Sequence, residues 1–172
     1  MRPSDEPLIS AERIRVRVSE LGEELSRDYA GKNPLFVGVL KGAIHFTSDL
    51  TRAMSIPLEI DFVSARSYVG MESSGTVEIG RRTDVDVAGR HVILVEDILD
   101  TGRTAVRLIK FLREQAPASL EICTLLDKPS RREEEVYGKY VGFEIEDRFV
   151  IGYGLDYEQQ HRELDAVYVM ES

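Results

Sequence analysis

Apolar and polar residues follow one another in blocks along the chain, and the blocks predict helices and strands in turn. Apolar residues recur at spacings of three and four between Ile14 and Leu25, which indicates an amphipathic helix over 11–29 with Ser10 as its N-cap. The run LFVGVL at 35–40 is short and apolar throughout, as in a strand that is buried on both faces.

The alternation continues to the end of the chain. A helix is expected over 42–54, and a polar, glycine-containing loop over 66–77. Further apolar runs predict strands at 58–64, 77–81, 92–95, 120–126, 149–153 and 166–170, and a helix at 104–114. Strands that alternate with helices, several of them apolar throughout, predict an α/β fold with a mainly parallel sheet. Ligands bind beyond the carboxyl ends of the strands in such sheets.

Length and charge narrow the class of protein. A chain of 172 residues predicts a single domain over 1–172. The formal net charge of −9 argues against nucleic acid as a general partner, because binding to the phosphate backbone needs a basic face. Cys123 is the single cysteine, which excludes an internal disulfide and fits a reducing compartment. The first seven residues are polar and no apolar run reaches the length of a membrane span, so we expect a cytoplasmic protein without a membrane partner.

The segment VILVEDILDTGRTA at 92–105 carries the clearest chemical signal. Two adjacent carboxylates, Glu96 and Asp97, follow an apolar strand and can accept hydrogen bonds from vicinal hydroxyls or help to hold a hydrated magnesium ion. The residues at 101–104 can present backbone N–H groups to a phosphate at a helix start. Asp100 lies between these two sub-sites, where a reacting group is expected.

A simpler interpretation explains the same residues as a solvated acidic turn that caps a helix. Neither a Walker loop nor a dinucleotide-binding fingerprint occurs in the chain. The residues of this segment by themselves therefore leave both interpretations open.

The run VEDILDTGRT resembles the phosphoribosyl diphosphate (PRPP) signature of type I phosphoribosyltransferases, most of all in members that act on hypoxanthine and guanine. Four further segments resemble this family in the same order: GVLKGAIHF its pyrophosphate loop, RSYVG its flexible active-site loop, LLDKPSRR its purine-contacting lysine segment, and RFVIGYGLDYEQQHREL its purine and metal segment. The resemblance implies the type I phosphoribosyltransferase fold. In that fold, helices flank a mainly parallel sheet and a small hood subdomain is built from chain-terminal segments.

The resemblance also implies roles within the signature. Glu96 and Asp97 match the acids that bind the ribose hydroxyls, and Asp100 matches the general base at the purine nitrogen N7. The residues that match the 5′-phosphate loop are Thr101, Gly102, Arg103 and Thr104. The family often has lysine in place of Arg103, but the contact there is largely made by the backbone.

Two loops of the family are matched by shorter segments. Lys41 and Gly42 match the loop that binds pyrophosphate, in which the peptide bond corresponding to Leu40–Lys41 is often cis. Ser67 and Tyr68 match the pair in the flexible loop that closes over the reacting centre, and closure would exclude water from the reactive sugar.

Three residues match the purine-binding part of the family. Lys128 matches the lysine that donates a hydrogen bond to the purine 6-oxo group, and an ammonium there disfavours the 6-amino group of adenine, which presents donors. Phe149 matches the aromatic side chain that stacks on the base, and Val150 the residue whose backbone meets the purine edge.

Two later residues match the metal and pyrophosphate contacts. Asp156 matches the carboxylate that binds the metal together with Glu96 and Asp97, and Arg162 matches a pyrophosphate contact. The neighbouring residues 160–161 depart from the aromatic-containing sequence that is common in the family at this point.

The implied activity is purine salvage. It transfers the phosphoribosyl group from PRPP to hypoxanthine or guanine and gives IMP or GMP and pyrophosphate, with Mg²⁺ as cofactor and a homodimer or homotetramer as the assembly. The alternatives are a PRPP- or nucleotide-sensing regulator on the same fold, a xanthine- or adenine-preferring transferase, and a plain nucleotide-binding domain. The acidic balance and Asp100 favour the enzyme over the regulator.

Overall fold

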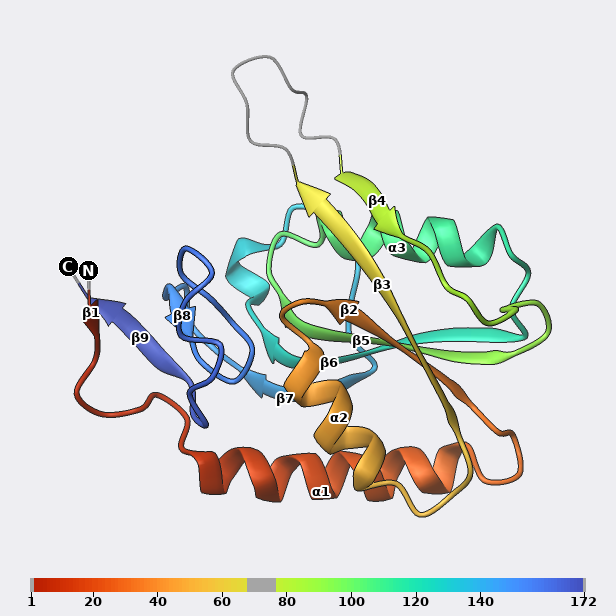
Figure 1. Cartoon of the computed structure of the whole chain (residues 1–172), viewed down its shortest axis with the longest axis horizontal. Coiled ribbons are helices and arrows are strands. Elements are labelled where there is room, and N and C mark those ends of the chain that lie inside the picture. Colours follow the sequence, from red (N-terminus) through yellow and green to blue (C-terminus); the bar gives the residue numbers. More distant parts are fainter. Residues whose placement is uncertain (1, 68–76, 172) are drawn as a thin grey trace.

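The computed structural model describes residues 2–67 and 77–171. Their main feature is a six-stranded sheet of order β4-β3-β2-β5-β6-β7 (Figure 1). Its strands are β2 (Leu35–Leu40), β3 (Glu59–Ser67), β4 (Val77–Arg81), β5 (His91–Leu99), β6 (Ser119–Asp127) and β7 (Tyr140–Glu144). All neighbours pair in parallel except β3 and β4, which are antiparallel at one edge. The predicted α/β fold with a mainly parallel sheet is confirmed.

Three helices cover the two faces of this sheet (Figure 1). Helices α1 (Ala11–Asp28) and α2 (Ile44–Arg52) share one apolar cluster with the sheet, and α3 (Arg103–Arg113) lies in the other. The side chain of Ser10 accepts a hydrogen bond from the backbone N–H of Arg13 at 3.3 Å, as expected of the N-cap of α1. The predicted helices at 11–29, 42–54 and 104–114 are all present, with ends displaced by one or two residues.

Strand β2 explains why apolar runs without alternation form the centre of the sheet. The side chain of Phe36 belongs to the cluster with α1 and α2, whereas Leu35 and Val37 belong to the cluster with α3. Successive side chains of a strand point to opposite faces, so both faces of this strand must be apolar. The prediction of a doubly buried strand at 35–40 is confirmed.

A second, small sheet is built from the two ends of the chain. Its order is β1-β9-β8, with β1 (Arg2–Pro3), β9 (Tyr168–Glu171) and β8 (Val150–Ile151) all antiparallel. The two ends of the chain therefore lie side by side (Figure 1). This sheet agrees with the hood that the family resemblance implied. The predicted strand at 149–153 is too long, because positive φ angles at Gly152 and Tyr153 turn the chain after β8.

Three further sequence predictions need correction. The strand predicted at 92–95 continues to Leu99, so Glu96 and Asp97 belong to β5 and not to a turn. Strand β7 and the short 3₁₀ helix η1 (Pro129–Arg131) were not predicted. Strand β3 extends to Ser67, into the region predicted as a loop at 66–77.

Within the described residues, no helix combines the length and apolar character needed to span a membrane.

Candidate active site

A cleft of about 380 Å³ lies at the carboxyl ends of β2 and β5, and many of the predicted site residues line it. Those that do are Lys41, Gly42, Glu96, Asp97, Asp100, Thr101, Gly102, Thr104, Asp156 and Arg162. The residues that follow β2 and those at the end of β5 meet because parallel strands end at the same edge of the sheet. Asp156 and Arg162 reach the same edge from the loop between β8 and β9.

The remaining predicted residues lie elsewhere. The side chain of Arg103 pairs with Glu133 at 2.6 Å and does not line the cleft. Ser67 is the last residue of β3, and Tyr68 lies outside the described residues.

None of the predicted purine-binding residues lines the cleft, but Lys128 is bonded to its edge. Lys128 is buried, and its backbone N–H donates to the carbonyl of Leu99, a cleft residue, at 3.0 Å. Phe149 is 51% exposed and meets the ring of Tyr157 edge-on. Val150 is buried in β8. The exposed ring of Phe149 offers a stacking face, and the ammonium of Lys128 offers hydrogen-bond donors, to a planar ligand.

Two glycines allow the backbone to approach Asp97. A Cβ atom on Gly42 would lie 1.7 Å from Oδ2 of Asp97, and one on Gly154 would lie 2.0 Å from the carbonyl oxygen of Gly42. Gly154 also has a φ of +101°, which residues with a side chain rarely adopt. Any side chain at either position would displace the carboxylate or the loop before α2.

Both adjacent acids hold their protons more strongly than exposed carboxyls do. Burial, and then the charge of Asp97, raise the pKa of Glu96 well above its usual value. Burial likewise raises the pKa of Asp97 to about 6, although the backbone N–H of Ile98 and the charge of Arg162 act in the opposite direction. Such a pair gains stability from a cation or from hydroxyl donors placed against it.

The acids fit a magnesium ion that keeps several of its waters. The described residues contain no cluster of three or more metal-binding side chains. Asp156 pairs with Arg162 at 2.8 Å and accepts a hydrogen bond from the backbone of Gln159 at 2.9 Å. Mg²⁺ commonly uses one or two carboxylates together with water and substrate phosphates, and Glu96 and Asp97 meet that requirement.

The start of α3 forms the other end of the cleft. Gly102, its N-cap, has a φ of +88° and supplies no side-chain cap to the first turn of the helix. A Cβ atom there would lie 2.6 Å from Cγ1 of Val136, so the loop packs directly on the segment after η1. The same segment is hydrogen-bonded to Thr101: the backbone N–H groups of Glu133 and Glu134 donate to the carbonyl of Thr101 at 2.9 and 3.1 Å. The exposed N–H groups of a helix start bind anions such as phosphate.

Arg162 and Lys41 meet at one side chain of the C-terminal loop. The side-chain oxygen of Gln159 accepts hydrogen bonds from both residues at 3.2 Å. Arg162 also donates to the carbonyl of Gly154 at 2.6 Å. The Leu40–Lys41 peptide bond is cis. Two cations are therefore held beside the carboxylates of the cleft, where a second anionic group of a ligand would lie.

Two arginines that sequence reasoning did not single out reach Asp100. Nε of Arg131 lies 3.4 Å from Oδ1 of Asp100, and Arg132 donates to the carbonyl of Asp100 at 3.4 Å. The guanidinium of Arg132 also pairs with Asp127 and donates to the carbonyl of Val136. Both lie in the segment LLDKPSRR, whose lysine is a predicted site residue. No local sequence pattern predicts which carboxylate an arginine will contact.

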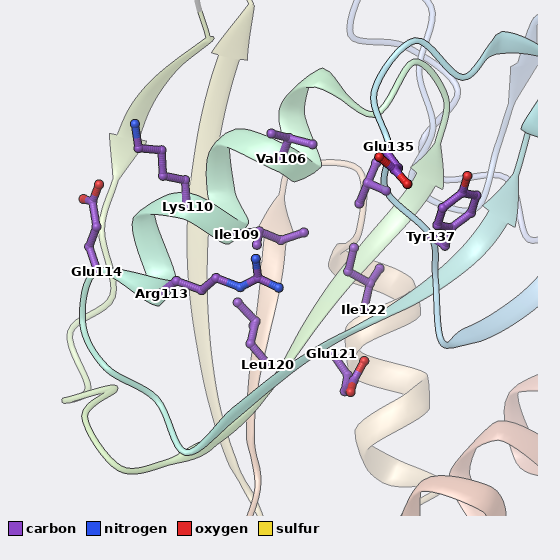
Figure 2. A pocket seen from close by; sticks show the side chains of 11 residues that line it. Val106, Ile109, Lys110, Arg113, Glu114, Leu120, Glu121, Ile122, Glu135 and Tyr137 are labelled. Atoms are coloured by element: carbon purple, nitrogen blue, oxygen red, sulfur yellow. The ribbon is translucent and has the colours of Figure 1, made fainter.

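A larger groove, of about 780 Å³, lies between α3 and β6 (Figure 2). Apolar side chains such as Ile109 and Leu120 form its floor, and charged side chains of both signs surround it (Figure 2). None of the predicted site residues line this groove. The smaller cleft is therefore the candidate active site, because it collects the acids, the cations and the helix start.

The family model of the phosphoribosyl transferase domain matches residues 9–158 of the chain. The chain belongs to the phosphoribosyltransferase family. This phosphoribosyltransferase is 47% identical over 164 residues to the hypoxanthine phosphoribosyltransferase of Haemophilus influenzae, an alignment that covers 93% of this chain and 92% of the relative. It is 44% identical over 165 residues to the hypoxanthine-guanine phosphoribosyltransferase of Bacillus subtilis, with 95% and 92% covered.

Solved structures of the same family resemble the fold of this phosphoribosyltransferase. A hypoxanthine phosphoribosyltransferase from Staphylococcus aureus superposes with a TM-score of 0.92 at 42% identity, and 97% of this chain and 91% of that chain are covered. The type I phosphoribosyltransferase fold is thereby confirmed, including the hood at the chain ends.

Proposed function

We propose that this phosphoribosyltransferase acts in purine salvage and transfers the 5-phosphoribosyl group of PRPP to hypoxanthine, guanine or both, giving IMP or GMP and pyrophosphate. The observation that carries the proposal is the single cleft that joins an acid pair, Asp100 and the uncapped start of α3. We assign the acid pair to the ribose hydroxyls of PRPP, the helix start to its 5′-phosphate, and Asp100 to the base that attacks its reacting carbon.

PRPP lies along β5 and the loop after it. Glu96 and Asp97 accept hydrogen bonds from the ribose hydroxyls, and the backbone at 101–104 holds the 5′-phosphate at the start of α3. The position of Gly102 against Val136 fixes that loop before the substrate arrives, which lowers the entropy cost of binding.

The pyrophosphate of PRPP lies toward the cations of the cleft. Lys41, the backbone of Gly42 and Arg162 hold it, since Gln159 already gathers the two cationic side chains there. The carboxylates of Glu96, Asp97 and Asp156 would hold Mg²⁺, which would supply charge neutralisation for the departing pyrophosphate.

The purine lies at the end of the cleft near Lys128. The ammonium of Lys128 donates to the 6-oxo group, the ring of Phe149 stacks on the base, and the backbone of Val150 meets its edge. The preference for 6-oxopurines over adenine follows from the three donors of an ammonium, which has no acceptor for an amino group.

The reaction exchanges one bond at the anomeric carbon of the ribose. The bond from C1′ to the pyrophosphate oxygen breaks, the bond from C1′ to a purine ring nitrogen forms, and Asp100 takes the proton that the purine loses. The sugar passes through a positively charged, oxocarbenium-like state, so positioning and the electrostatic field of the carboxylates dominate catalysis. We assign to Ser67, at the end of β3, and to Tyr68, outside the described residues, a part in excluding water from the reacting centre.

The proposal extends to the setting of the enzyme. We place it in the cytoplasm as a single domain over 1–172 that assembles as a homodimer or homotetramer. The acidic net charge supports the absence of a nucleic-acid partner.

One assay tests the proposed function. PRPP and Mg²⁺ are incubated with the protein and hypoxanthine, guanine, xanthine or adenine in parallel, and pyrophosphate release and nucleotide formation are measured. We expect turnover with hypoxanthine, guanine or both, and little with adenine. No turnover with any of the four bases would overturn the proposal, and turnover with xanthine alone would replace the substrate.

A further inference from the structure

Asp100 is held from outside the signature by a neighbouring segment of the chain. The segment after β6 folds back on the signature loop through backbone hydrogen bonds: the N–H of Lys128 donates to Leu99, and the N–H groups of Glu133 and Glu134 donate to Thr101. The residues between these anchors, including Arg131 in η1, are therefore fixed beside Asp100.

The two oxygens of the Asp100 carboxylate have different surroundings. Oδ1 is shielded from solvent and accepts no hydrogen bond from any described residue. Nε of Arg131, at 3.4 Å, is the cation that faces this oxygen. The side chain of Asp100 is nevertheless 38% exposed, so its exposure belongs to its other atoms, and Oδ2 is the oxygen that remains for a ligand.

Arg131 is itself held by a second carboxylate. Its Nη1 lies 3.6 Å from Oδ2 of Asp147, while the other oxygen of Asp147 lies 4.0 Å from Nζ of Lys128. Charges of opposite sign thus alternate in the order Lys128, Asp147, Arg131 and Asp100, across three segments of the chain. A guanidinium has donors on different edges of a plane and can contact two carboxylates at once.

We propose that Arg131 is a positioning residue that holds Oδ1 of Asp100, so that Oδ2 is directed at the ring N–H of the purine. One oxygen of Asp147 holds the guanidinium of Arg131 in this position. The other oxygen of Asp147 faces the ammonium of Lys128, the proposed contact of the purine. This inference rests on the proposed function, because it gives Arg131 a role only if Asp100 accepts the purine proton. The role is absent from the signature sequence, since the arginine follows Asp100 by 31 positions.

The first test replaces Arg131 with an uncharged side chain of similar length. We expect Arg131→Met to lower the single-turnover rate with hypoxanthine by about tenfold, a part of the 10²–10⁴-fold that a positioned base contributes. The KM for PRPP and the thermal unfolding temperature should change little, because the backbone hydrogen bonds that hold the phosphate loop remain. Arg131→Lys should recover much of the rate, since an ammonium keeps the charge beside Oδ1. The matched control is Arg107→Met, which removes an exposed arginine of α3 outside the cleft.

The second test asks whether Arg131 acts through Asp100. In an Asp100→Asn background the Arg131→Met replacement should cost nothing further, whereas independent roles would multiply their effects. Asp147→Asn should produce a smaller loss of the same kind, and that loss should vanish in the Arg131→Met background. Multiplicative effects, or an Arg131→Met enzyme with the rate of the wild type, would overturn the inference.

The outcomes separate the inference from the proposed function. A wild-type protein without turnover on any of the four bases refutes the function itself. A wild-type protein with turnover, an impaired Asp100→Asn variant and an unimpaired Arg131→Met variant refute the role of Arg131 alone.

Discussion

Glu96 and Asp97, at the proposed PRPP end of the cleft, belong to β5, a nine-residue strand that pairs with β2 as far as Val95 and with β6 as far as Leu99. Val150, at the proposed base end, belongs to a two-residue strand of the small three-stranded sheet, and the neighbouring ring of Phe149 is 51% exposed. The PRPP end is thus fixed by packing and by backbone pairing. The base end depends on a few side chains and on ion pairs near the surface. Ligand-binding elements with few buried contacts open locally at lower cost than core strands do.

This difference in rigidity explains how one cleft can bind two substrates with different requirements. PRPP carries several charges and needs groups in fixed places around a reacting carbon, which a rigid sheet edge supplies. A purine is planar and needs a stacking face and one or two donors, which a smaller and more adaptable element can supply. The boundary between the two ends lies at Asp100.

The largest expected effect lies at that boundary. Asp100→Asn should lower kcat by about 10²–10⁴-fold, because the amide cannot take the purine proton. The unfolding temperature should change little, since the side chain is partly exposed. Steady-state kinetics with PRPP and hypoxanthine, together with a thermal melt, measure both quantities. A kcat equal to that of the wild type would remove Asp100 from the chemical step.

The next effect tests the rigidity of the PRPP end. Gly102→Ala adds a Cβ atom 2.6 Å from Val136 at a φ of +88°. Strain on the order of 1–3 kcal/mol should displace the phosphate loop and raise the KM for PRPP by roughly tenfold or more. Gly89→Ala is the matched control, because Gly89 has a φ of +70° and no atom lies within 4 Å of its added Cβ.

The contrast between these two glycines is measured by titrating PRPP and by chemical denaturation. The control variant should lose only about 1 kcal/mol of stability and keep its KM for PRPP. Equal changes in the KM for PRPP in both variants would mean that the change does not arise from the contact of Gly102 with Val136.

A smaller effect is expected from the base end. Lys128→Ala should raise the KM for hypoxanthine by about tenfold, the value of one hydrogen bond from a charged donor. The KM for PRPP should change much less, because none of the groups proposed to bind PRPP belongs to Lys128. Lys110→Ala, in the groove of Figure 2, is the control and should alter neither constant. Equal losses for both substrates would show that the two ends are not independent.

The smallest effect concerns the sheet under the PRPP end. Cys123 is fully buried on β6, where it pairs with Val95, and burial raises the pKa of its thiol above the usual value. A raised pKa leaves less of the reactive thiolate at any given pH, so a thiol reagent at pH 8 should react slowly with the folded protein. The reaction should accelerate in urea in parallel with unfolding. Rapid reaction without urea would contradict the rigid sheet, and the rate is followed by the absorbance of the released reagent.

The sequence was informative where the local pattern and the tertiary environment agree. LFVGVL at 35–40 was assigned with its correct ends, because a strand between two helical layers needs no polar side. The strand at 92–95 was ended too early because adjacent acids are typical of turns. In the structure, pairing with β6 continues through Glu96 and Ile98 and overrides that local preference. Strand β7 was missed because YVGFE is short and contains a glycine. Gly142 is required there, since a Cβ would lie 2.4 Å from the carbonyl oxygen of Leu125.

The candidate site divides in the same way. Residues 96–104 are contiguous, so one motif predicted the acid pair, the central aspartate and the phosphate loop together. Arg131 and Arg132 reach Asp100 from another segment, and no spacing rule relates positions that lie 31 and 32 residues apart. They reach the site because the chain after β6 folds back on the loop that contains Asp100, and only the three-dimensional structure shows this.

The antiparallel pairing of Arg2 with Glu171 has a consequence for synthesis on the ribosome. The six-stranded sheet, with the acid pair and the start of α3, uses residues up to 144, whereas the small sheet near the proposed base end needs β1, β8 and β9 together. Strand β1 emerges first and must wait for β9, so the base end forms late, after the rest of the domain has emerged. A nascent chain whose residues up to about 150 have all left the ribosome is therefore expected to hold a phosphate-binding edge before it has a complete place for a purine.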